Sequence, residues 1–154
     1  MSAEFSYFRT MNEADLAWVQ SVEKVSYPFP WSSQGFMKVL DDGLGYVLCD
    51  AEQRSLGYAC FLSVLDEIHL LNFCVAPAFR CNNVASQALQ KFKIHFAEAG
   101  FAVMLLEVRA SNPARKLYQR MGFAEDGMRK GYYPLKDCVE KEDAILMSWR
   151  LSAA

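Results

Sequence analysis

Two side chains that can move protons stand toward the two ends of one segment, MLLEVRASNPARKLYQRMGF, residues 104–123. Glu107 is a carboxylate inside an apolar run, and Tyr118 is a phenol further along the segment. Because side chains alternate between the two faces of a strand, Glu107 shares its face with Leu105 and Arg109. We expect apolar neighbours around Glu107, a setting that suits a carboxylate acting as a general base. A carboxylate that only forms a salt bridge, here with Arg109, is the alternative interpretation.

A short helix is expected to carry Tyr118. Asn112 can cap its start, Pro113 suits its first turn, and Gly122 suits the left-handed residue just past its end. At helical spacing, Tyr118 lies on the edge of the inward face. The residues expected on that face are Ala114, Leu117 and Met121. Tyr118 is therefore either a proton donor or a half-buried packing residue.

The turn RCNNVAS, residues 80–86, lies between an apolar strand pattern and an amphipathic helix pattern. Backbone amides at a helix N-terminus, together with the helix dipole, favour phosphate groups. Asn83 tolerates left-handed backbone better than most residues, although it is bulkier than a glycine. The turn is therefore either a phosphate-binding loop or an ordinary strand-to-helix connection that binds nothing.

The composition is ordinary for a compact domain. With 154 residues, the chain is expected to form a single domain over residues 1–154 and to bury about 70% of its unfolded surface. Apolar residues make up 53% of the chain, charged residues 22%, and the formal net charge is -2. Such a charge provides no broad attraction to nucleic acid or to an anionic membrane, so we expect neither as a direct partner.

Five cysteines form no CxxC pair and have no histidine at metal-binding spacing: Cys49, Cys60, Cys74, Cys81 and Cys138. We expect reduced thiols, no metal site and, without histidine partners, no cysteine nucleophile. The N-terminus lacks a signal-peptide pattern, and no apolar run approaches the ~18 residues of a membrane span. The expected location is therefore the cytoplasm.

Hydrophobic periodicity predicts strands and helices that alternate along the chain. Strands are expected at residues 4–9, 46–50, 55–64 and 67–75, and helices at residues 12–26, 33–40 and 84–99. A strand, a helix and a strand are then expected from residue 101 to about 130, followed by a last strand at residues 143–150. Three antiparallel-type strands followed by a strand-helix-strand crossover predict an α/β fold, with a mixed sheet and helices on both faces.

Several segments, in this order, resemble the Gcn5-related N-acetyltransferase (GNAT) superfamily. They are FPW at 29–31, LDE at 65–67, LLNFCVAP at 70–77, LEVRASN at 106–112, LYQRMGF at 117–123, GYYP at 131–134 and EDAILM at 142–147. Within the superfamily, the chain is most similar to the enzymes that acetylate the N-terminal alanine of a small-subunit ribosomal protein. The resemblance implies the acyl-CoA N-acyltransferase fold, a central mixed β-sheet flanked by helices, and acetyl-CoA as the acetyl donor.

The resemblance also implies roles for individual residues. Glu107 would be the general base, Tyr118 would protonate the departing thiolate, and Asn112 would contact the coenzyme. The strand backbone at Phe73, Cys74 and Val75 would pair with the pantetheine arm. The pyrophosphate would be wrapped by Arg80, Cys81, Asn82, Asn83, Val84, Ala85 and Ser86. Asn83 stands where the family's loop carries its first glycine.

The resemblance implies direct acetyl transfer in a ternary complex, without a covalent enzyme intermediate. Two aromatic segments, Tyr27–Trp31 and Tyr132–Pro134, are expected in loops, where they either pack against the protein or admit an extended peptide. Acidic residues near the second segment, either a solvated turn or an attraction for a basic peptide, are Asp137, Glu140, Glu142 and Asp143. The alternatives are an acetyltransferase for another amine, such as a lysine, a polyamine or a drug, and a non-catalytic coenzyme A sensor.

Overall fold

The structure is a computed structural model that describes residues 3–136 and 140–151. Its elements in chain order are β1 (Tyr7–Thr10), the 3-10 helix η1 (Glu13–Asp15), α1 (Leu16–Ser26), α2 (Ser33–Asp41), β2 (Gly45–Cys49), β3 (Ser55–Val64), β4 (Glu67–Val75), the 3-10 helix η2 (Pro77–Phe79), α3 (Val84–Glu98), β5 (Val103–Arg109), α4 (Ala114–Met121), β6 (Ala124–Pro134) and β7 (Lys141–Arg150). The strands form a sheet in the order β1-β2-β3-β4-β5-β7-β6. The α/β fold with a mixed sheet is confirmed.

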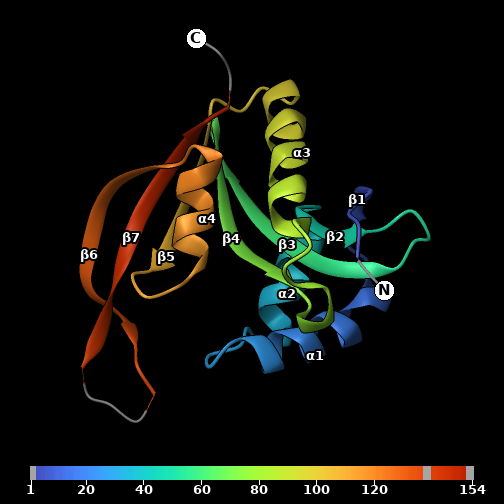
Figure 1. The fold of residues 1–154 in the computed structure, drawn as a ribbon, viewed down its shortest axis with the longest axis horizontal. Helices are drawn as coiled ribbons and strands as arrows, with labels where there is room; N and C mark the ends of the chain where they lie inside the picture. The colour runs from blue at the N-terminus through green and yellow to red at the C-terminus, as the bar shows by residue number, and fades with distance from the viewer. Residues whose placement is uncertain (1–2, 137–139, 152–154) are drawn as a thin grey trace. The chain divides into compact units, whose positions relative to one another are not determined.

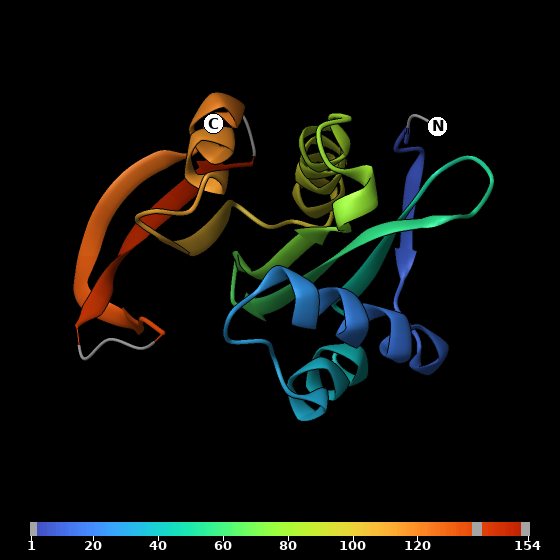
Figure 2. The same cartoon turned by 60° about the horizontal axis from the view of Figure 1, so that its bottom comes forward.

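The first of two compact units contains the chain up to Leu62 and Leu70–Phe92. Within it, β1 pairs antiparallel with β2, and β2 pairs antiparallel with β3. Helices α1 and α2 lie on one face of β3 and β4, and the first half of α3 lies on the other (Figure 2). The predicted arrangement of helices on both faces of the sheet is therefore present in this unit.

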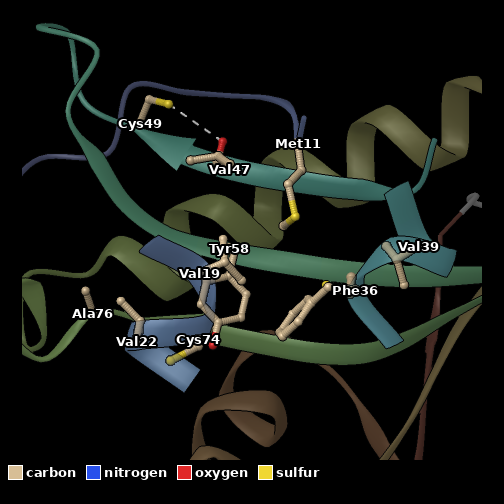
Figure 3. Packing of buried hydrophobic residues seen from close by; sticks show 11 residues of the cluster. Met11, Val19, Val22, Phe36, Val39, Val47, Cys49, Tyr58, Cys74 and Ala76 are labelled. Carbon is tan, nitrogen blue, oxygen red and sulfur yellow. Dashed lines mark hydrogen bonds between the residues drawn. The ribbon is translucent and has the colours of Figure 1, made fainter. Parts of the chain in front are cut away.

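The core of the first unit lies between the sheet and the α1 and α2 helices. Phe36 and Tyr58 meet edge to face with ring centroids 5.9 Å apart, and both are fully buried (Figure 3). Val19 from α1 and Cys74 from β4 belong to the same buried cluster (Figure 3). Truncation of a buried phenylalanine costs about 3–5 kcal/mol, so Phe36 is central to the stability of this unit.

The second unit contains Ser63–His69 and the chain from Lys93 onward. Strands β6 and β7 run side by side as a long antiparallel hairpin, and β5 pairs with the other edge of β7 (Figure 1). Gly122 ends α4 in the left-handed region at φ +117°. A side chain at Gly122 would lie 3.0 Å from Nε1 of Trp149, so both the backbone angle and the close approach require glycine.

Several predicted boundaries differ from the structure. The first strand begins at Tyr7 rather than at residue 4, because its partner β2 covers only Gly45–Cys49. The helix expected from residue 12 begins as a 3-10 turn, although Asn12 caps it as predicted. Strand β6 extends to Pro134 because β7 begins at Lys141 and pairs with it, so the prediction of a loop at Tyr132–Pro134 was wrong.

The expected single domain over residues 1–154 stays a prediction. Among the residues that the structure describes, no helix is long and apolar enough to cross a membrane.

Candidate active site

Glu107 lies on the more exposed face of β5. Met104, Leu106 and Val108 are buried on the opposite face, which confirms the predicted alternation. Oε1 of Glu107 lies 3.2 Å from Nη2 of Arg129, and the Glu107 side chain is 32% exposed. The expectation of apolar surroundings was therefore wrong. The ion-pair partner is Arg129 on β6, not Arg109, since β6 joins the same sheet through β7.

Two arginine-tyrosine pairs surround this carboxylate in the second unit. The guanidinium of Arg109 lies 4.6 Å from the ring centre of Tyr133, and that of Arg129 lies 5.4 Å from the ring centre of Tyr132. Burial and then the negative charge of Glu107 raise the pKa of Tyr133. Glu107 therefore faces a surface of arginine and tyrosine side chains.

Arg129 was not predicted as a site residue, and Tyr133 was predicted only as part of a loop that admits a peptide. The predicted strand ended near residue 130, which placed Tyr133 in a loop. In the structure, Tyr133 pairs with Glu142 and Arg129 pairs with Ala144, so one strand carries both side chains. A strand predicted through Tyr133 would have placed Arg129 and Tyr133 on the same element.

Tyr118 is the buried residue of α4. The prediction placed it at the edge of the inward face, but only 6% of the residue is exposed. Its ring lies 5.4 Å from that of Phe123, which in turn lies 4.8 Å from Trp149 on β7. This aromatic neighbour explains the deep position, and burial raises the pKa of Tyr118. The phenol therefore keeps its proton at neutral pH, as a proton donor must.

Asn112 positions the start of α4. Its Oδ1 accepts a hydrogen bond from the backbone N–H of Ala114 at 2.9 Å, which confirms the predicted capping role. Just before it, Oγ of Ser111 donates to Glu142 at 2.7 Å. These contacts attach the β5–α4 connection to β7 and fix the first turn of the helix that carries Tyr118.

The expected acidic cluster has structural partners. Glu142 accepts hydrogen bonds from Ser111, and Oδ1 of Asp143 accepts one from the N–H of Gly131 at 2.9 Å. Asp137 lies outside the described residues. The two bound carboxylates therefore organise the β6–β7 hairpin and the loop before α4.

The end of β4 provides the backbone expected to pair with pantetheine. A side chain at Gly57 on β3 would clash with the carbonyl oxygen of Cys74, so that carbonyl faces β3. Carbonyls alternate along a strand, and those of Phe73 and Val75 therefore face the other edge. Tyr27 Oη donates to the Phe73 carbonyl at 2.8 Å. The pairing of this strand end with pantetheine stays a prediction.

Arg80 joins the end of β4 to α1. Its Nε donates to the Val75 carbonyl at 3.0 Å, and its Nη2 donates to Oγ of Ser26 at 3.0 Å. The guanidinium thus holds the strand end, the η2 turn and the last residue of α1 in fixed positions. Arg80 therefore has a positioning role in the loop that it begins.

The loop before α3 contains two left-handed residues, Cys81 at φ +66° and Asn83 at φ +60°. Asn83 thus occupies the backbone region that a glycine adopts most easily. Its carbonyl accepts from Oγ of Ser86 at 3.1 Å and from the N–H of Gln87 at 3.1 Å, which starts the helix. The amides at 84–86 have no acceptor within the helix, as at any helix N-terminus, and can bind an anion.

Loop geometry is completed by Asn82. Its Nδ2 donates to the Arg80 carbonyl at 2.9 Å and to the Phe79 carbonyl at 3.3 Å.

Among the described cysteines, Cys49, Cys60 and Cys74 are buried, and Cys81 is exposed. Burial raises the pKa of Cys60, which favours the protonated thiol.

The predicted site residues fall into two groups. Phe73, Cys74, Val75 and the loop 80–86 belong to the first unit, and Glu107, Asn112 and Tyr118 belong to the second. Within each group the residues lie on adjoining elements. The described residues contain no cluster of three or more possible metal ligands.

The comparisons with known proteins agree on one family. The acetyltransferase (GNAT) family model matches residues 8–123. The chain is 32% identical over 146 residues to the [ribosomal protein bS18]-alanine N-acetyltransferase of Escherichia coli K12, covering 93% of this chain and 96% of that protein. The enzyme of the same name from Haemophilus influenzae is 31% identical over 145 residues, covering 93% of this chain and 97% of that protein.

Solved structures show the same fold. The crystal structure of the ribosomal-protein-S18-alanine N-acetyltransferase from Escherichia coli has a TM-score of 0.85 at 31% identity, covering 96% of this chain and 95% of that one. Arabidopsis thaliana NAA60 in complex with acetyl-CoA has a TM-score of 0.82 at 19% identity, covering 94% of this chain and 98% of that one.

Proposed function

The chain belongs to the acetyltransferase (GNAT) family and is an N-acetyltransferase, and we propose that it transfers the acetyl group of acetyl-CoA to the N-terminal amine of a ribosomal protein that begins with alanine. The observation that carries this proposal is the 32% identity, over 93% of the chain, to an enzyme named for that reaction. With a ribosomal protein as the acceptor, we expect the reaction to take place in the cytoplasm.

The first unit supplies the groups that suit acetyl-CoA. Left-handed Asn83 and the first amides of α3 suit a pyrophosphate, since both the free N–H groups and the helix dipole favour negative charge. The β4 edge at Phe73 and Val75 suits the amide-containing pantetheine arm, which can pair with it as a strand does. The residues present therefore fit the donor.

The second unit supplies the proton chemistry. The acceptor amine attacks the acetyl carbon as Glu107 takes one of its protons, directly or through a water. The C–S bond then breaks, and Tyr118 gives its proton to the sulfur. Arg129, 3.2 Å from Glu107, keeps the carboxylate oriented. No bond to the enzyme forms during the transfer.

An N-terminal amine suits this base better than a lysine does. The pKa of an α-amine is about 8, and that of a lysine is about 10.4. Deprotonation at pH 7 therefore costs roughly 1.4 kcal/mol for the α-amine and about 4.6 kcal/mol for the lysine, at 1.36 kcal/mol per unit. The α-amine therefore needs the smaller deprotonation and is the acceptor that suits a carboxylate base better.

The decisive experiment uses a peptide that begins with alanine and carries lysines further along. With acetyl-CoA, the enzyme should acetylate the α-amine, and mass-spectrometric fragmentation locates the acetyl group. The matched control is the same peptide with a blocked N-terminus, which should give no product. Acetylation of a lysine on the blocked peptide would overturn the α-amine assignment and favour another amine as substrate.

A thiol-release assay separates the enzyme from the coenzyme A sensor. An enzyme releases free coenzyme A in proportion to the acetylated peptide. A sensor would show a higher melting temperature with acetyl-CoA but no thiol release with any amine.

A further inference from the structure

Glu23 on α1 is a buried carboxylate that lies outside the proposed catalytic machinery. Only 2% of the residue is exposed. Its Oε1 accepts hydrogen bonds from Tyr58 Oη at 2.6 Å and from Asn72 Nδ2 at 2.9 Å, and its Oε2 accepts one from the backbone N–H of Trp31 at 2.9 Å. All three donors are neutral. A charge buried among neutral donors is costly, so these contacts must hold it tightly.

The Trp31 contact attaches one end of the segment between α1 and α2. At the other end, the N–H of Tyr27 donates to the backbone carbonyl of Glu23 at 3.0 Å. Between these ends, Pro28 and Pro30 have restricted φ angles. The segment Tyr27–Trp31 is therefore short, stiff and fixed to Glu23 at both ends.

The same segment touches the strand that is proposed to bind the donor. The Tyr27 phenol donates to the Phe73 carbonyl at 2.8 Å, and Asn72, the residue before Phe73, donates to Glu23. At its centre the segment exposes Phe29, of which 44% is accessible. The buried carboxylate of Glu23 therefore connects, through hydrogen bonds, the segment that carries exposed Phe29 with β4.

We propose that Glu23 is a positioning residue: its carboxylate holds the Tyr27–Trp31 segment at a fixed place on β3 and β4, and this segment forms a wall of the acceptor peptide site. The proposal rests on the proposed function. It deepens that function by assigning acceptor binding, rather than proton transfer, to the segment that Glu23 holds.

Glu23→Gln tests this role with minimal change of shape. A carboxylate accepts on both oxygens, whereas a glutamine amide accepts on only one. The amide oxygen should keep the two donors from Tyr58 and Asn72, which leaves the glutamine NH₂ opposite the N–H of Trp31. Two donors then face each other, and the Trp31 end of the segment is released.

The kinetic test compares KM for the two substrates. Glu23→Gln should raise KM for the alanine peptide by about tenfold, the loss expected for one hydrogen bond to a charged group. KM for acetyl-CoA and kcat should change less than about twofold. The matched variant Tyr58→Phe removes a hydrogen bond to Oε1 but leaves the Trp31 contact, so it should lower the melting temperature while raising the peptide KM much less than Glu23→Gln does.

Amide hydrogen exchange tests the attachment without any substrate. Exchange should accelerate at Trp31 and its neighbours in Glu23→Gln, and not along α1 as a whole. If the wild type is active and Glu23→Gln keeps the peptide KM, or raises both KM values equally, the positioning role is overturned. A wild type that acetylates no α-amine overturns the proposed function and this role with it, whereas exchange that stays unchanged at Trp31 overturns the attachment alone.

Discussion

Asn83 provides a quantitative test of the phosphate-loop geometry. Its φ of +60° places it in the left-handed region, where most side chains are strained by about 1–2 kcal/mol and asparagine by less. We therefore expect Asn83→Ala to lower the free energy of unfolding by about 1 kcal/mol. For a chain of this size, that corresponds to a melting temperature lower by about 2–4 °C. The two hydrogen bonds to residue 83 use its carbonyl and survive the substitution.

Asn83→Gly should be nearly neutral for stability. Glycine removes the remaining strain, but it also gives the unfolded chain more freedom, at a cost of roughly 0.4–1 kcal/mol. The left-handed φ of residue 83 presents the α3 amides to acetyl-CoA. Asn83→Gly should therefore bind acetyl-CoA as well as the wild type does, or better. Alanine favours the left-handed region less, so fewer unbound molecules hold the loop in the binding-competent form, and Asn83→Ala should bind acetyl-CoA more weakly than the wild type.

Gln53 supplies the matched control. It lies in the β2–β3 turn of the same unit with φ +69°. Glutamine and alanine are both strained in the left-handed region, so Gln53→Ala should change neither the melting temperature nor the acetyl-CoA affinity measured by isothermal titration calorimetry. An Asn83→Ala variant as stable as the wild type would contradict the strain at residue 83. A loss of affinity in Asn83→Gly would mean that the asparagine side chain itself contacts the coenzyme.

Three further substitutions test the second unit. Glu107→Gln should lower kcat by on the order of 10²- to 10⁴-fold with acetyl-CoA affinity unchanged, and full activity across pH 6 to 9 would exclude Glu107 as the base. Tyr118→Phe should slow acetyl transfer while the protein stays folded; loss of stability without loss of rate would indicate a packing role alone. Burial raises the pKa of Tyr118, so above about pH 10 the wild type releases the phenol proton when it unfolds. Tyr118 then lowers the free energy of unfolding by about 1.36 kcal/mol for each pH unit. Urea titrations above pH 10 should show a shallower decline for Tyr118→Phe, and an identical decline would contradict the burial argument. Gly122→Ala should lower the free energy of unfolding by roughly 1–3 kcal/mol, because φ is +117° and Trp149 lies close, and an unchanged melting temperature would contradict this.

Short-range signals in the sequence were sufficient to predict much of the fold. Asn12 and Asn112 cap their helices, and Gly122 ends α4, because a cap or a left-handed stop depends on residues within one turn. The bounds of β3 and β4 were also correct, since a turn separates them and both are rich in apolar residues. The motifs that carry the family resemblance are local in the same sense.

Tertiary structure alone decided the surroundings of the candidate catalytic residues. Glu107 pairs with Arg129 only because β7 places β6 within reach of β5, and Tyr118 is buried only because Phe123 and Trp149 lie beneath α4. Glu23 likewise acquires its role through Tyr58 and Asn72, which are distant in the chain. A periodic pattern shows which face of an element is apolar, but it does not show which element covers that face. The order in which the strands pair therefore determines the partner, burial and charge environment of these residues.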